Sequence, residues 1–155
     1  MPRFTDALDR TASEVKRAPA MPVGFYKFRV ARVPEIRENK DKTFEIMNVP
    51  VQVLEAIDVD ADDLAAFGPV NGKPNRVSFL FPTTEDREND YENALDQFKT
   101  FCERCGIDVE DGTVKMWMAN LPNSQFIAEV THRADENDPS IVYAEINRSR
   151  ITKVE

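Results

Sequence analysis

The residues of this sequence best suited to nucleophilic or metal chemistry are two cysteines and one histidine. Cys102 and Cys105 have the C-x-x-C spacing that serves thiol exchange or zinc binding. They fall at the C-terminal end of a predicted helix, whereas a reactive thiolate is stabilised at a helix N-terminus, and zinc needs two further ligands. We therefore interpret both as buried core thiols. His132 lies on an otherwise apolar strand face and is interpreted as a packed or hydrogen-bonded residue.

Other motifs that would indicate catalysis are missing from the sequence. Four aspartates between residues 58 and 63 resemble part of a calcium loop but lack its central glycine and distal glutamate. The five glycines form no nucleotide-binding or hydrolase motif. We predict that the protein is not an enzyme and has no metal site or cofactor. A hydrolytic or metal-dependent enzyme is an alternative that stoichiometric bound metal would favour.

Aromatic and basic side chains alternate along several predicted strands. Proteins bind single-stranded nucleic acid in this way, because bases stack on aromatic rings while cations contact the phosphates. Most of the ten phenylalanines must form the core, so we expect the tyrosines, the tryptophan and the basic strand faces at the surface. The candidate nucleic-acid-binding residues are Tyr26, Lys27, Arg29, Arg32, Lys42, Phe44, Arg76, Trp117, Tyr143, Arg148 and Arg150.

The chain of 155 residues has the length of one domain, and its 41% hydrophobic and 31% charged residues exclude wholesale disorder. Residues 1–20 are expected to form an N-terminal arm or short helix that ends at a proline-rich segment. The folded domain is then residues 21–155. We expect a soluble cytoplasmic protein with no membrane association, because no apolar run reaches roughly 18 residues and no signal-peptide pattern is present.

Hydrophobic periodicity predicts three strands, one amphipathic helix and two further strands. Residues 35–42 are expected as an exposed hairpin loop and residues 58–72 as an acidic connection, while residues 114–119 fit either a strand or a helical turn. This order matches the OB-fold. We predict a mainly β, five-stranded, OB-fold-like Greek-key barrel whose helix lies between strands 3 and 4. The predicted strands are 24–33, 43–55, 76–81, 126–133 and 141–154, and the helix is 91–105.

The net charge of −8 is unevenly distributed along the chain. Residues 58–63 and 85–111 together carry −11, which leaves +3 for the remainder, where bases cluster in predicted strands. An acidic lobe beside a basic face suits a protein that holds a polyanion on one side only. Two alternatives stay open: the acidic loops are merely solubilising, or they make the protein an interaction or inhibitor module that mimics nucleic acid or docks a basic partner.

The segment MPVGFYKFRV at residues 21–30 resembles the opening of small phage-encoded single-stranded DNA-binding proteins, whose first strand often starts with Pro-x-Gly-x-Tyr. Three later segments resemble that group in their order along the chain and in the character of their residues: 98–106, 126–133 and 143–146. The resemblance therefore covers most of residues 21–147. The resemblance implies an OB-fold that binds single-stranded DNA independently of sequence in replication or recombination. It also implies no catalysis, and a location in the cytoplasm of an infected host cell.

The C-terminus departs from that group, because many of its members end in an acidic tail that recruits replication partners. This chain ends in RSRITKVE. Either the acidic loops contact replication or recombination proteins instead, or the protein does not have the replicative role. The sequence leaves open whether the protein forms a homodimer and whether it prefers DNA or RNA.

Overall fold

A computed structural model describes residues 3–14 and 18–154 of the chain, and it is mainly β. The strands are β1 Gly24–Val30, β2 Glu35–Glu38, β3 Phe44–Val59, β4 Pro74–Pro82, β5 Gln125–Ala134 and β6 Val142–Lys153. The helices are α1 Arg3–Ala7, α2 Ala61–Phe67, α3 Glu88–Arg104 and α4 Val114–Asn120, with single 3-10 turns at Ala12–Glu14 and Glu85–Arg87.

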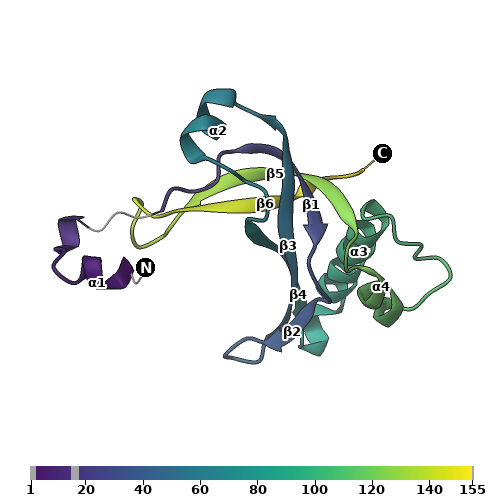
Figure 1. The fold of residues 1–155 in the computed structure, drawn as a ribbon. Coiled ribbons are helices and arrows are strands. Elements are labelled where there is room, and N and C mark those ends of the chain that lie inside the picture. The colour runs from purple at the N-terminus through teal and green to yellow at the C-terminus, as the bar shows by residue number, and fades with distance from the viewer. Residues whose placement is uncertain (1–2, 15–17, 155) are drawn as a thin grey trace.

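All six strands belong to one antiparallel sheet, in the order β2-β3-β1-β5-β6 with β4 paired to β3. The long strand β3 pairs along one edge with β2 and then β1, and along its other edge with β4 (Figure 1). Within the described part of the chain, no strand pairing joins β4 to β6. The sheet is therefore open between these two strands, which we call the seam.

The expected five-stranded closed barrel needs two corrections. β2 is a sixth strand in a segment that we predicted to be a loop. This segment carries no strand signal, because its four residues are all exposed and show no hydrophobic alternation. Pairing with β3 alone stabilises it. The second correction concerns the closure of the barrel. β4 and β6 approach each other at the seam, but no backbone ladder joins them, so the sheet is not a closed barrel.

The core lies between the inner face of the sheet and α3. Tyr26, Phe28 and Val30 of β1 point inward, as the alternation of this strand predicts. Phe126 of β5 stacks on Phe28 with ring centroids 5.3 Å apart, and Phe101 of α3 meets Phe126 edge-on at the same separation. Such aromatic pairs stabilise a core beyond their buried area. The apolar stripe of α3 thus packs against the open sheet, as the spacing over residues 91–105 predicts.

Two expectations about single residues are confirmed here. Cys102 and Cys105 are free, buried thiols within the core cluster. His132 Nε2 lies 2.8 Å from the carbonyl oxygen of Met21, so the histidine is hydrogen-bonded and ties β5 to the segment before β1. Residues 114–120 form the helix α4, whose first turn is capped by the Thr113 hydroxyl.

The N-terminal segment carries the short helix α1, which lies apart from the sheet in Figure 1. The expected arm also includes residues 1–2 and 15–17, which lie outside the described residues. In the ranges that the structure describes, no helix combines the length and the apolar character needed to cross a bilayer.

Gly24 begins β1 at a point where two strands approach closely. Its φ is +142°, and a Cβ atom there would lie 2.5 Å from the Asp58 carbonyl oxygen and 2.8 Å from Val59 Cγ2. We expect Gly24→Ala to lower the free energy of unfolding by about 1–3 kcal/mol, measured by urea denaturation. Gly112→Ala is the control, because its nearest neighbour would be 3.5 Å away. Equal stabilities of the two variants would contradict the proposed strain.

Burial also makes the stability sensitive to alkaline pH. Desolvation, helped by the charge of Asp63, raises the pKa of Tyr26 to about 12, and desolvation with Glu103 raises the pKa of Cys102 to about 12. Both pKa values exceed those of the unfolded chain, so the stabilisation is complete below about pH 9 and is lost as the pH rises toward 12. Urea midpoints between pH 8 and 11 should fall, and less steeply for Cys102→Ala; a flat profile would refute this.

Candidate nucleic-acid interface

A groove runs over the outer face of β3 and β4. Side chains that alternate with the core residues face outward here, and Asn48 of β3 pairs with Ser78 of β4, whose hydroxyl lies 2.6 Å from the Asn48 amide oxygen. One hollow of about 300 Å³ extends from Arg32 across this surface, and a second of about 710 Å³ lies between β4 and β6. Both are lined by Asn75 and Arg76, so the two hollows adjoin at these residues, and we treat them together as one groove. We call it the β4 groove.

Four arginines and three carboxylates line the β4 groove. The arginines are Arg32, Arg76, Arg133 and Arg148, and the carboxylates are Glu35, Asp135 and Glu145. The groove is therefore slightly positive in a chain whose net charge is −8. Such local charge, rather than the net charge, decides where a polyanion binds.

Two of the four arginines in the groove lack carboxylate partners among the described residues. Neither Arg76 nor Arg148 forms an ion pair with any residue of the described ranges. Arg148 donates a hydrogen bond from Nη1 to the Ser78 carbonyl oxygen at 2.9 Å, and its guanidinium lies 5.6 Å from the centre of the Phe79 ring. These contacts hold the cation in place without neutralising it.

The other two arginines of the groove are paired with carboxylates. Arg32 lies 3.7 Å from Glu35, and Arg133 donates a hydrogen bond to Glu145, which raises the pKa of the arginine. All four side chains are well exposed, so water and dissolved ions screen both pairs.

Side chains, rather than a backbone ladder, hold the seam together. Asn75 Nδ2 donates to the Ala144 carbonyl oxygen at 3.2 Å, and Arg148 supplies the second bridge through Ser78. Two side-chain hydrogen bonds thus join β4 and β6 where no backbone ladder does, and they lie in the floor of the β4 groove.

Tyr143 supplies an exposed aromatic ring at the β6 side of the groove. Its side chain is 40% exposed, the Arg133 guanidinium lies 5.0 Å from the ring centre, and its hydroxyl donates to Asp135 at 3.0 Å. The backbone N–H of Asn137 and the Tyr143 hydroxyl lower the pKa of Asp135, so this carboxylate accepts both bonds in its charged form. The ring is therefore held in place between the contact with Arg133 and the hydrogen bond to Asp135.

Three of the predicted cations lie on the neighbouring outer face of β1, β5 and β6. Lys27 lies 3.5 Å from Glu55, and Arg150 lies 4.0 Å from Glu129 with its guanidinium over the Phe25 ring. Arg29 donates to the Asn123 and Gln52 side chains at 2.8 and 2.6 Å. Of these three, only Arg29 reaches a groove residue, through Gln52.

Tyr26 requires a correction, because we expected it at the surface. It is fully buried, and its hydroxyl donates to the Pro22 carbonyl oxygen at 2.7 Å, so it cannot stack on a base. Its place on the inner face of β1 follows the alternation of the strand, and a backbone carbonyl satisfies the hydroxyl that seemed to need solvent.

The last three candidates lie outside the β4 groove. Trp117 is half-buried on α4, packed against the core cluster. Phe44 at the start of β3 is half-buried beneath Arg87, whose guanidinium lies 4.9 Å from the ring centre. Lys42 is exposed in the turn before β3, where its φ is +59°.

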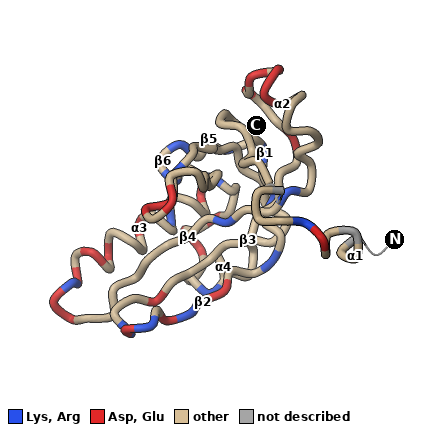
Figure 2. The backbone as a smooth tube through the Cα atoms, turned by 90° about the vertical axis from the view of Figure 1, so that its left-hand side faces the viewer, with Lys and Arg blue, Asp and Glu red and all other residues tan. Residues whose placement is uncertain are grey.

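The acidic residues are only partly separated from the basic ones. Figure 2 shows Asp and Glu along α2 and α3, while Lys and Arg occur on several strands and also on loops and helices. Four strand or loop cations nevertheless pair with glutamates across or beside their strands. The predicted segregation therefore holds for α2, is partial on α3, and fails on the β1 face, where Lys27 is paired with Glu55.

Among the groove residues that sequence reasoning missed are Arg133 and Leu80. Leu80 is 50% exposed between the inward-facing Phe79 and Phe81, so the alternation of β4 already places it outside. Arg133 adjoins Tyr143 only through the pairing of β5 with β6. No individual segment carries that information.

No model of a known protein family and no curated protein sequence matches this chain. The function is therefore argued from the geometry of the groove.

Arg29 tests the difference between a structural and a binding arginine. We expect Arg29→Ala to lower the free energy of unfolding by about 1–2 kcal/mol, because two hydrogen bonds between strands and a loop are lost. Chemical denaturation measures the change, with the exposed Arg37→Ala on β2 as the control. If both variants were as stable as the parent, the two bonds would have no structural role.

Proposed function

We propose that this protein is a non-enzymatic, OB-fold-like binder of single-stranded DNA that acts in replication or recombination without sequence preference. One observation carries the proposal: the uncompensated Arg76 and Arg148 share a groove with the exposed Tyr143 ring. Cations for phosphates and a ring for base stacking are the two components that single-strand binding requires.

The position of the groove supports this proposal. If the short strand β2 and the short helices α1, α2 and α4 are set aside, the chain has three long strands, then α3, then two strands, which is the element order of the OB-fold. In that fold, oligonucleotides bind on the face of the second and third strands and on the adjoining loops. The second and third long strands of this chain are β3 and β4, and their outer face forms the groove.

The chemistry of the groove favours single strands and sequence independence. A Tyr143 ring can stack on any base, and each stacked base contributes about 1–3 kcal/mol in proteins of this type. Arg76 and Arg148 would contact phosphates, which are the same in every sequence. The acidic faces of α2 and α3 would repel the strand from the rest of the surface and so keep it in the groove.

Partners and location follow as parts of the same proposal. The acidic faces of α2 and α3 would offer a surface for replication or recombination proteins, and the resemblance of residues 21–30 to phage proteins supports a location in the cytoplasm of an infected cell. A second candidate function rests on the same helices: an acidic module that docks a basic protein. Capture of one basic partner, together with indifference to oligonucleotides at low salt, would favour this second candidate.

We expect Arg76→Ala combined with Arg148→Ala to weaken binding of a fluorescein-labelled oligonucleotide by about tenfold or more per arginine at low salt, measured by anisotropy. The loss should be similar for different sequences. The slope of log K against log salt should also become shallower by about 1.4, because each phosphate contact contributes about 0.7 on single strands.

The control is Lys115→Ala, which removes an exposed cation from α4 outside the groove. It should change both the affinity and the salt slope much less than the double variant. If the parent protein did not bind the oligonucleotide at low salt, the proposed function would be wrong. If the control and the double variant lost equal affinity, the β4 groove would not be the binding site.

A further inference from the structure

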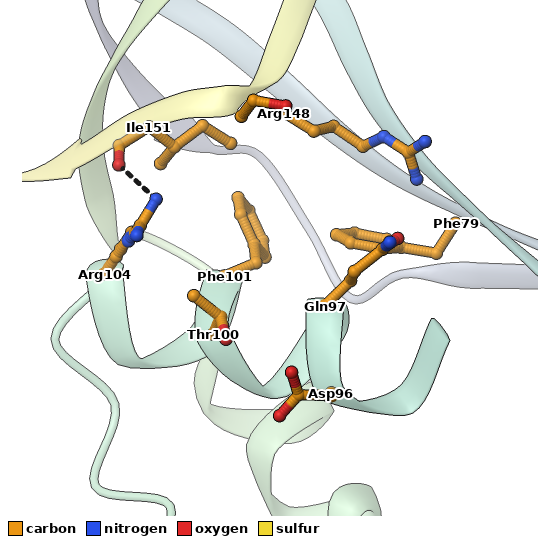
Figure 3. Close-up of a pocket in the computed structure, with 9 residues that line it drawn as sticks. Phe79, Asp96, Gln97, Thr100, Phe101, Arg104, Arg148 and Ile151 are labelled. Atoms are coloured by element: carbon orange, nitrogen blue, oxygen red, sulfur yellow. Dashed lines mark hydrogen bonds between the residues drawn. The ribbon is translucent and has the colours of Figure 1, made fainter. Parts of the chain in front are cut away.

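A separate pocket of about 270 Å³ opens between α3, β4 and β6, and the close-up in Figure 3 shows the residues around it. Arg148 lines both this pocket and the β4 groove, so the two hollows adjoin at one side chain.

The base of the pocket is aromatic and its mouth carries a flat cation. The rings of Phe79 and Phe101 contact each other with centroids 5.6 Å apart. The Arg148 guanidinium sits over Phe79, which fixes its position while the side chain stays exposed. Guanidinium planes and aromatic rings are the surfaces on which proteins stack unpaired bases.

The rim of the pocket is polar. Gln97 and Thr100 of α3 line it, and in Figure 3 the Gln97 side chain points toward Phe79 and Arg148. Neither side chain hydrogen-bonds to another residue in the part of the chain that the structure describes, whereas Arg104 donates to the Ile151 carbonyl oxygen at 2.8 Å. An amide and a hydroxyl offer donors and acceptors together, so they can meet the edge of any base.

The size of the pocket restricts what can enter. Its volume lies slightly below the roughly 300–1,000 Å³ of pockets for drug-sized ligands, which suits one planar ring system. An apolar base with a few polar groups at the rim is the usual composition of such a site.

We propose that this pocket receives one nucleobase of the single strand that lies in the β4 groove. The base stacks on Arg148, and its edge faces Gln97 and Thr100. The inference rests on the proposed function, and it adds a contact that detects the presence of a base rather than its identity. Arg148 then contacts the strand twice, through its charge in the groove and through its plane at the pocket.

The test compares a labelled oligonucleotide with a fully abasic one of the same length, which keeps the phosphates and loses every base. The ratio of the two affinities measures the contribution of the bases alone. Thr100→Phe fills the pocket and should reduce that ratio by roughly five- to hundredfold, the equivalent of one stacked base, while affinity for the abasic strand stays unchanged. Gln97→Ala should reduce the ratio less.

The matched control is Asn93→Phe, which adds the same ring at an exposed position of α3 outside the pocket and should leave the ratio unchanged. Gln97→Ala replaces an exposed side chain, so it tests the pocket even if Thr100→Phe fails to fold. If the parent protein binds neither oligonucleotide, the proposed function fails. If it binds and neither pocket variant alters the ratio, the groove stands and the base pocket is refuted. A change in self-association without a change in the ratio would assign the pocket to a second protein chain and overturn the inference.

Discussion

The contacts of Arg148 connect the main features of this molecule. Through its bond to the Ser78 carbonyl it bridges two strands that no backbone ladder joins, and through the Phe79 ring it rests on the core. The same guanidinium separates the β4 groove from the pocket beneath α3. A long side chain with a planar head can perform these tasks together because its stem packs while its charge stays at the surface. A lysine at this position would offer a point charge without the plane.

Hydrophobic alternation and the helical stripe predicted most of the framework, because burial on one face imposes a period that a single segment reveals. β1, β4, β5 and α3 all follow it. β2 did not, since its four residues are exposed on both faces and only the edge of β3 stabilises it. The extension of β3 to Val59 depends on pairing with Gly24, a residue 35 positions earlier in the chain.

The candidate site was less predictable than the fold, for a physical reason. Whether a cation is free depends on which residue faces it across a strand, and register is a property of two segments. Lys27 faces Glu55 and is paired, whereas Arg76 faces Pro50 and has no carboxylate opposite. Tyr26 shows the same limit for rings: its polar hydroxyl suggested exposure, but the Pro22 carbonyl accepts that bond inside the core.

The position of Trp117 has a practical consequence for work in solution. This single indole is half-buried on α4 against the core, outside both the groove and the pocket. We expect its intrinsic fluorescence to follow the opening of the core, because its indole packs against the core cluster. A ligand in the proposed groove would not touch it, so binding is better followed with a label on the ligand.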